Sequence, residues 1–275
     1  MSEPDRSPRS NTVFDRAAET YGRVGPDLSQ QLGSLLLRHV ILRGDETVLD
    51  LAAGTGASAL PAARKLDAYG LVVAVDLAYA MLNRLKQDAS SPSLKNLVLA
   101  KMDAQALAFR ADAFDVVVCG LALDSFSNRL GALRELKRVL TPGGQIALSV
   151  APSWWWEQDG RWQWHHDVVQ ALNIEVLGGD RSLEHPDELE ALLRSAGFRA
   201  PRATQHDIAL IFKDEHEWWD WTWSHGYRRV LEAMNRRQLD EYKTACFSYL
   251  SRRPAGAPIL GKLAATVAVA VNPLS

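Results

Sequence analysis

The sequence has little cysteine, no long apolar run and almost no excess of charge. Its two cysteines, Cys119 and Cys246, exclude a disulfide framework and a cysteine-rich zinc site. The longest apolar stretches, near 114–123 and 263–271, span about ten residues, whereas a membrane-spanning helix needs about 20. With 31 Lys plus Arg against 33 Asp plus Glu the net charge is −2, so we expect no broad basic face and no nucleic-acid partner.

The first ten residues, M-S-E-P-D-R-S-P-R-S, lack the apolar segment of a secretory signal. We expect residues 1–12 to form a disordered tail, and the protein to be cytoplasmic without a membrane partner. The adjacent pair His165 and His166 has no carboxylate or cysteine at ligand spacing, so no metal site is expected. A composition with 47% hydrophobic and 23% charged residues is typical of a globular protein.

After this tail, apolar strands alternate with helices along the chain. The sequence predicts helices over 13–21, 28–40, 57–66, 78–86, 130–140 and 186–196. It predicts strands over 47–51, 71–75, 97–100, 114–118, 145–150, 204–212 and 264–271. This alternation indicates βαβ units and an α/β fold, in which helices cover both faces of a mainly parallel sheet.

The most informative segment is V-L-D-L-A-A-G-T-G, residues 48–56, where a predicted strand ends in a glycine turn that opens a helix. Doubly wound sheets bind ligands here, at the carboxyl ends of their strands. Asp76 lies 22 residues after Gly54, at the end of the next strand, where a carboxylate can accept hydrogen bonds from both hydroxyls of a ribose. Because Gly54-x-Gly56-x-x-Ala59 also satisfies the dinucleotide fingerprint, the turn alone fits a nicotinamide enzyme as well as an adenosyl enzyme.

Three further features favour the adenosyl interpretation. Asp50 lies within the strand, where its carboxylate would repel a pyrophosphate but attract an ammonium or sulfonium group. Asp103 follows the third strand in K-M-D-A-Q, a position from which it can accept a hydrogen bond from an adenine amino group. The turn contains no Arg or Lys that could pair with phosphates.

Five segments follow one another in order: V-L-D-L-A-A-G-T-G, V-V-A-V-D-L-A-Y-A-M-L, K-M-D-A-Q, F-D-V-V-V-C-G-L-A-L and L-K-R-V-L-T-P-G-G. Together they resemble the class I S-adenosylmethionine-dependent methyltransferases, most of all the quinone-biosynthesis type and its relatives acting on small molecules and natural products. The resemblance covers about residues 12–212. It implies S-adenosylmethionine as cofactor and S-adenosylhomocysteine as product. It also implies a Rossmann-like, doubly wound sheet of seven strands, mostly parallel with an antiparallel last strand, closed by the strands over 204–212 and 264–271.

On this basis residues 13–275 form a single methyltransferase domain. Its parts are an N-terminal helical cap at 13–45, a cofactor-binding core at 46–152 and two substrate-lid insertions at 153–185 and 213–262. We expect a monomer or a homodimer.

The resemblance also assigns cofactor contacts. Ala52, Gly54 and Gly56 would hold the methionine part and the edge of the ribose, although Ala52 stands where the family has its first glycine. Asp50 would lie near the methionine ammonium, and Asp76 would bind the ribose hydroxyls. The other implied contacts pack on the adenine, flank the methionine or belong to an N-terminal helix that closes over the cofactor: Leu77, Met81, Asp103, Ala104, Cys119, Gly120 and Tyr21.

All nine tryptophans fall within the two insertions, at 154, 155, 156, 162 and 164 and at 218, 219, 221 and 223. We expect them to form an aromatic pocket for a flat or polycyclic substrate. The alternative is that they only attach the insertions to the scaffold. The candidate substrate-binding residues are Trp154, Trp155, Trp219, Trp223, Tyr227 and Phe14.

A general base is needed only when the methyl acceptor arrives protonated. His225, in S-H-G-Y-R, is the first candidate, followed by His165 and His166. Asp124, beyond the fourth strand, is a candidate for orienting an amine or hydroxyl, with helix capping as its structural alternative. The predicted reaction is methyl transfer to N or O of a small aromatic or polycyclic metabolite in natural-product biosynthesis. The alternatives are an NAD(P)-dependent oxidoreductase and a non-methylating protein of the same fold.

Overall fold

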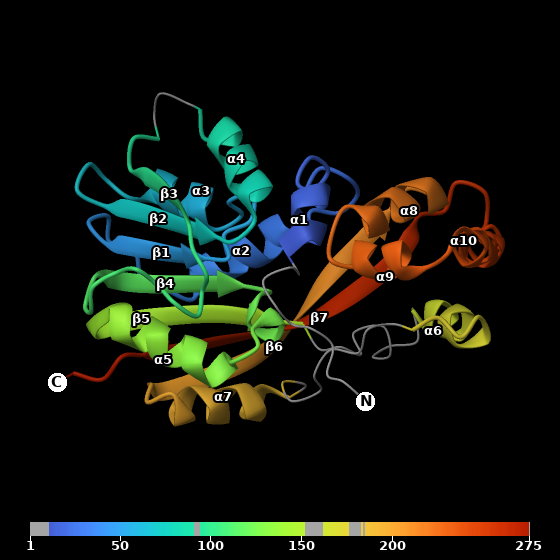
Figure 1. Ribbon diagram of the computed structural model, residues 1–275. Coiled ribbons are helices and arrows are strands. Elements are labelled where there is room, and N and C mark those ends of the chain that lie inside the picture. The colour runs from blue at the N-terminus through green and yellow to red at the C-terminus, as the bar shows by residue number, and fades with distance from the viewer. Residues whose placement is uncertain (1–10, 91–93, 152–161, 176–182, 184, 275) are drawn as a thin grey trace.

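The computed structural model describes residues 11–90, 94–151, 162–175, 183 and 185–274. Its centre is a seven-stranded sheet in the order β3-β2-β1-β4-β5-β7-β6 (Figure 1). The strands are β1 (Thr47–Leu51), β2 (Leu71–Asp76), β3 (Leu97–Lys101), β4 (Phe114–Gly120), β5 (Leu140–Val150), β6 (Arg199–Phe212) and β7 (Ile259–Val271). β7 runs antiparallel to both of its neighbours, which confirms the predicted, mostly parallel Rossmann-like sheet with an antiparallel last strand.

Helices cover both faces of the sheet because successive side chains of a strand point to opposite sides. Val48, Val72 and Val116 pack in one core with α2 and α3, while Leu49 and Val117 pack in a second core with α5 and α7. The helices are α1 (Asn11–Ala17), α2 (Leu28–Arg38), α3 (Ala59–Lys65), α4 (Tyr79–Asp88), α5 (Arg129–Val139), α6 (Gln163–Ala171), α7 (Pro186–Ser195), α8 (Glu215–Trp223), α9 (Arg228–Ala233) and α10 (Arg236–Leu250), with a short 3-10 helix, η2 (Leu123–Ser125). Within the described residues, no helix combines the length and apolarity needed to cross a bilayer.

Some predicted boundaries were wrong. α1 begins at Asn11, inside the segment expected as a tail, and it ends at Ala17, so that Tyr21 lies in the turn that follows. The turn expected over 141–144 is an irregularity within β5, whose register against β4 shifts at this point. β6 ends where predicted but begins earlier, at Arg199, which pairs with Val271 of β7. β7 is longer than predicted because 259–263 continue to pair with β6 after β5 has ended.

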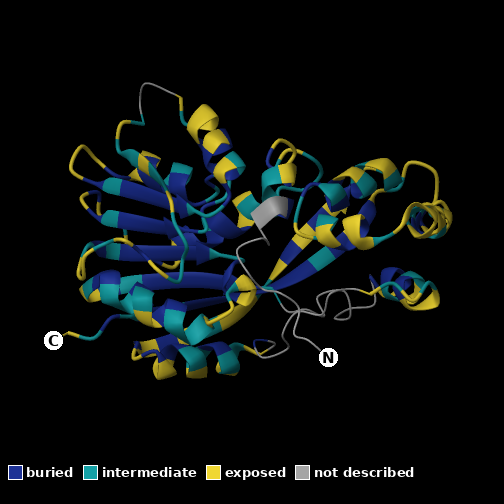
Figure 2. Cartoon of the chain, in the orientation of Figure 1, coloured by how far each residue is buried: buried dark blue, intermediate teal, exposed yellow. Residues whose placement is uncertain are grey.

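This continuation carries a separate layer of helices, which we call the aromatic arm. It consists of 208–212 of β6, 259–263 of β7, and α6, α8, α9 and α10 (Figure 1, right). Figure 2 shows that α6 has buried residues on one side and exposed residues on the other. The buried residues of α6 and α8 include Trp164, Trp218 and Trp221. Trp164 lies 5.4 Å from Trp218 between ring centroids, and Phe212 lies 5.1 Å from Trp221.

Two indole groups anchor the helices of the arm, one to the β7 part of the arm and the other to the scaffold. The Trp162 Nε1–H donates to the Lys262 carbonyl oxygen at 3.0 Å, and the Trp221 Nε1–H donates to the Pro26 carbonyl oxygen at 3.2 Å. The Trp162 ring covers Gly261 so closely that an added Cβ would come within 2.1 Å of it. These contacts support the alternative, anchoring role for these two tryptophans.

Candidate active site

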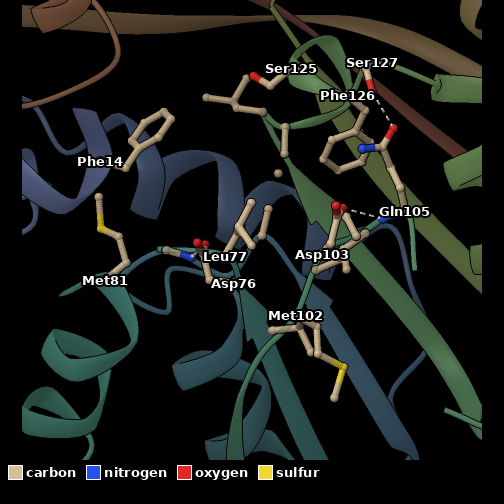
Figure 3. Close-up of a pocket in the computed structure, with 18 of the residues that line it drawn as sticks. Phe14, Asp76, Leu77, Met81, Met102, Asp103, Gln105, Ser125, Phe126 and Ser127 are labelled. Carbon is tan, nitrogen blue, oxygen red and sulfur yellow. Dashed lines mark hydrogen bonds between the residues drawn. The ribbon is translucent and has the colours of Figure 1, made fainter. Parts of the chain in front are cut away.

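A cavity of about 640 Å³ opens at the carboxyl ends of β1 to β4 (Figure 3). Carboxylates from two strand ends, Asp76 and Asp103, face apolar side chains such as Leu77 and Met81. Cavities of this size and mixed lining are typical of small-molecule sites. The sheet topology places it where doubly wound folds bind ligands.

Asp76 is held in place by two backbone N–H groups. Its Oδ2 accepts from Gly54 N at 2.8 Å, and its Oδ1 accepts from Ala78 N at 2.7 Å. Burial raises the pKa of this carboxyl, and the two N–H groups oppose the rise by stabilising the charge. Each carboxylate oxygen can accept a second hydrogen bond, so the pair suits the two hydroxyls of a ribose.

The turn that holds this carboxylate is built from three left-handed residues. Ala52, Gly54 and Gly56 have φ values of 54°, 53° and 90°. At Gly54 no atom lies within 4 Å of an added Cβ, so the backbone faces open space, whereas at Gly56 the Cβ would meet Leu85 at 2.3 Å. Ala52 accepts the conformation at a cost of about 1 kcal/mol, so the missing glycine leaves the shape of the turn intact.

Asp50 lies beside the turn in a smaller cavity of about 50 Å³, which shares Tyr21, Ala52 and Gly54 with the large one. The residue is 2% exposed, and its Oδ2 has no hydrogen-bond partner among the described residues. Burial, with a smaller contribution from the charge of Asp76, raises the pKa of Asp50 to about 8. A backbone hydrogen bond from Ala59 opposes this rise. A buried carboxyl with one unpartnered oxygen is stabilised by a cation, so this end of the cavity suits the ammonium of an amino acid.

The opposite end of the cavity is bordered by the loop after β3. Asp103 Oδ1 accepts from Gln105 N at 2.9 Å, which leaves Oδ2 able to accept a further hydrogen bond (Figure 3). Leu77, Met102 and Ala104 line the cavity beside it. From one end to the other, the two adjoining cavities thus offer three features. The Asp50 carboxyl suits an ammonium, the Asp76 carboxylate suits a diol, and the apolar slot beside the Asp103 acceptor suits an amino-substituted ring.

Comparison with known proteins decides between an adenosyl cofactor and a nicotinamide cofactor. The family model described as "Methyltransferase domain" matches residues 49–148. Aklanonic acid methyltransferase DauC of Streptomyces sp. strain C5 is 30% identical over 149 residues, which cover 54% of this chain and 68% of that protein. The chain belongs to the class I S-adenosylmethionine-dependent methyltransferases. This membership sets the nicotinamide interpretation aside.

Other similarities extend over nearly the whole chain. Nocamycin O-methyltransferase of Saccharothrix syringae is 28% identical over 265 residues, covering 90% of this methyltransferase and 92% of the relative. The crystal structure of the YcgJ protein from Bacillus subtilis shares the fold, with a TM-score of 0.60 and 18% identity over 89% of this chain and 99% of that chain. The cofactor is S-adenosylmethionine, and the orphaned Asp50 oxygen and the open Gly54 backbone fit its methionine and ribose parts.

Most of the predicted cofactor residues come together at one cavity. Those that line the large cavity are Tyr21, Ala52, Gly54, Asp76, Leu77, Met81, Asp103, Ala104 and Gly120. Asp50 lines the small one. Gly56 and Cys119 line neither: Gly56 shapes the turn from behind, and Cys119 is 1% exposed in the core that contains α5.

Sequence reasoning missed several lining residues after β3 and β4. They are Met102, Gln105, Leu121, Ala122, Ser125, Phe126 and Ser127. Their location at the site could have been predicted, because each follows a strand whose carboxyl end was already assigned to the site. The conformation of Leu121 was not: its φ of 52° is left-handed, a strained geometry that is concentrated at functional sites.

The histidines proposed as bases lie in the aromatic arm. His165 and His225 line a second cavity of about 10 Å³ together with Trp162, Trp218 and Tyr227, which leaves room for about one water at most. His165 Nε2 lies 2.6 Å from the Tyr242 hydroxyl and 3.2 Å from that of Tyr227.

Burial lowers the pKa of both His165 and His225 to about 4, so both rings are neutral at pH 7. His166 is half-buried on α6. None of these three side chains lines the large cavity.

The remaining substrate candidates divide between the cavity and the arm. Phe14 of α1 lines the large cavity and lies 3.8 Å from the position of a Cβ at Gly226, where α1 meets the arm. Trp219 lies under the Lys243 ammonium at 5.0 Å, and Trp223 lies under the Arg228 guanidinium at 5.5 Å, so both belong to the arm. Tyr227 is in the arm as well, and Trp154 and Trp155 lie outside the described residues.

Asp124 lies in η2, between the cavity-lining residues Ala122 and Ser125. The residue is exposed, and partial desolvation by the protein packed around it raises the pKa of the carboxyl. The charges of Arg129 and Arg229 act in the opposite direction, the latter from α9 of the arm. Among the described residues, no three His, Cys, Asp or Glu side chains gather as a metal site requires.

Proposed function

We propose that this methyltransferase methylates an oxygen of a small, planar aromatic or polycyclic metabolite of the polyketide or quinone type. Two relatives support this substrate class by name, an aklanonic acid methyltransferase and a nocamycin O-methyltransferase. Several demethylmenaquinone methyltransferases, 30% identical over half of this chain, add the quinone type.

The observation that carries the proposal is the apolar end of the large cavity. Beyond the carboxylates, this part of the lining includes Phe14, Leu121 and Ala122, with Ser125 near them. Figure 3 shows Phe14 and Ser125 on this side of the cavity. An aromatic wall with few polar groups suits a flat acceptor and fixes its orientation. The short distance between Phe14 and Gly226 supports a position of the arm at this end, where it can cover the acceptor.

S-adenosylmethionine supplies a methyl group activated by the adjacent sulfonium. The protein contributes orientation and exclusion of water, because methyl transfer depends on holding the two reactants in line. For a protonated acceptor we assign the proton-accepting role to Asp124, which lies beside the cavity and whose pKa is raised by desolvation. His165, His166 and His225 act through the arm, by fixing the shape of its aromatic layer.

The test is a panel of aromatic acids, phenols, hydroquinones and anilines, incubated with S-adenosylmethionine and analysed by mass spectrometry. We expect oxygen-methylated products from planar acids or phenols. Methylation of anilines alone would contradict the oxygen assignment, and binding of S-adenosylhomocysteine without any methylation would favour the non-methylating alternative.

Asp124→Asn tests the proton-accepting role on whichever acceptor the panel identifies. We expect turnover of a phenol to fall at least about tenfold, with unchanged affinity for S-adenosylhomocysteine. Asp45→Asn, an exposed carboxylate before β1 at the opposite edge of the sheet, is the matched control. Equal turnover in the two variants would remove Asp124 from the reaction.

A further inference from the structure

We infer that Gln105 is a positioning residue for the cofactor, which acts by holding Phe126 as a wall of the adenine end of the cavity. The inference concerns a residue to which the motif comparison assigned no role. It is independent of the identity of the methyl acceptor.

The Gln105 side chain joins two loops that border the cavity. Its Oε1 accepts a hydrogen bond from the Ser127 hydroxyl at 2.9 Å (Figure 3) and another from Asn128 N at 2.9 Å. The two bonds occupy both lone pairs of this oxygen. One half-buried side chain of the loop after β3 therefore holds the loop between η2 and α5.

Both ends of this connection are themselves fixed. On one side, Gln105 N donates to Asp103 Oδ1 at 2.9 Å, which ties the same residue to the carboxylate at the adenine end. On the other side, Asn128 Oδ1 accepts from Gly131 N at 2.8 Å and caps α5. A shift of the loop would break the cap or the connection, so the loop has one preferred position.

The loop carries Phe126, which lines the large cavity together with Asp103, Ala104 and Gln105. Figure 3 shows its ring next to the Gln105 side chain and above Asp103. Phe126 is only half-buried, because its side chain packs against the core that contains α5 and also lines the cavity. An aromatic ring at this position can pack on the adenine, and such stacking commonly changes affinity by about tenfold.

The hydrogen bonds of Gln105 distinguish a role in holding the loop of Phe126 from a direct polar contact with the cofactor. Toward the described residues, the Gln105 side chain uses only its oxygen, as an acceptor from an O–H and an N–H donor. A carboxylate oxygen can accept the same two bonds, so glutamate can replace glutamine here. An aliphatic residue of similar size cannot.

The test is a double-mutant cycle, read by calorimetric binding of S-adenosylhomocysteine. We expect Gln105→Ala and Phe126→Ala each to weaken binding by about tenfold. The double variant should bind no more weakly than Phe126→Ala alone, because both changes remove the same wall. Gln105→Glu should bind within about twofold of the wild type, which a purely apolar packing role would not allow.

Gln238→Ala is the matched control, because the Gln238 side chain also accepts from a backbone N–H, that of Asn235 at 3.0 Å, at the exposed start of α10. It should leave binding unchanged. Ser127→Ala removes only one of the two bonds and should give an intermediate loss, and it serves as the second variant if Gln105→Ala does not fold. The inference is overturned if the losses of Gln105→Ala and Phe126→Ala multiply in the double variant, or if Gln105→Glu binds as weakly as Gln105→Ala.

Discussion

The carboxyl edge of the sheet and the aromatic arm both enclose cavities, but these differ in size and in the chemistry of their buried polar groups. The sheet edge has about 640 Å³ of space and a buried Asp50 carboxyl oxygen that no described residue satisfies. The arm has about 10 Å³; its buried His165 nitrogen lies within hydrogen-bond distance of two tyrosine hydroxyls, and its buried His225 Nδ1 has no partner among the described residues. A carboxyl beside space of this size calls for a ligand, whereas an aromatic cavity with room for about one water provides shape.

The largest effect is expected at the sheet edge. Asp76→Ala removes the acceptor for the ribose hydroxyls and also the anchor of the Gly54 N–H. Because hydrogen bonds to a charged group contribute about 1.5–3 kcal/mol each, affinity for S-adenosylhomocysteine should fall by about 100-fold or more. Calorimetric titration measures this, with Asp207→Ala on the exposed edge of β6 as control. A loss below tenfold would mean that the ribose binds elsewhere.

Removing aromatic side chains from the arm tests whether the arm acts on the methyl acceptor and the sheet edge on the cofactor. The double variant Trp219→Ala/Trp223→Ala should reduce methyl transfer by about tenfold while cofactor affinity changes less than twofold, because an orienting surface acts on the acceptor. Steady-state turnover and calorimetry on the same preparation provide both numbers. Equal losses in the two measurements would contradict the assignment of the arm to the acceptor.

The next effect concerns the stability of the arm. His165→Ala removes the partner that the hydroxyls of Tyr227 and Tyr242 share and leaves them only each other, at 3.2 Å, which should cost about 1–3 kcal/mol. The folded pKa of His165, about 4, lies below its unfolded value near 6.5. Its contribution is therefore fully present above pH 6.5 and is lost as the pH falls through about 4.

Thermal unfolding of the wild type and His165→Ala at pH 7, 5 and 4 measures both the loss and its pH dependence. The difference in stability between the two proteins should shrink toward pH 4, and affinity for S-adenosylhomocysteine at pH 7 should be unchanged. A constant difference across this range would show that the ring is not the titrating group.

The smallest effect is expected at the turn. Ala52→Gly relieves a left-handed φ of 54°. The relief of about 1 kcal/mol is offset by the larger entropy of the unfolded glycine chain, so stability should change by less than about 1 kcal/mol. Cofactor affinity should stay within about threefold of the wild type. A tenfold loss would instead identify the Ala52 methyl group as a cofactor contact.

The sheet edge was predictable because its signals are local. The strand, the glycine turn and Asp76 lie within one βαβ unit, and the parallel sheet necessarily brings the end of the strand before Asp103 to the same edge. Two features of the sheet edge could not be predicted because they depend on conformation. They are the left-handed backbone of Leu121 and the hydrogen bonds from the Gln105 side chain to a loop more than twenty residues away.

The arm was less predictable because its contacts join distant parts of the chain. Trp162 bonds to Lys262 and His165 to Tyr242, pairings that no local period shows. The tryptophan clusters indicated an aromatic element but not α8, α9 and α10. His225 was chosen as a base for its residue type, whereas the burial that lowers its pKa to about 4 arises only in the folded arm.

A crystal structure of the complex with S-adenosylhomocysteine tests the division between sheet edge and arm most directly. The account predicts the ribose hydroxyls on Asp76, the amino-acid end toward Asp50, the adenine between Asp103 and Phe126, and no cofactor contact with the arm tryptophans. Adenine stacked on Trp219 or Trp223, or a ribose away from Asp76, would contradict it.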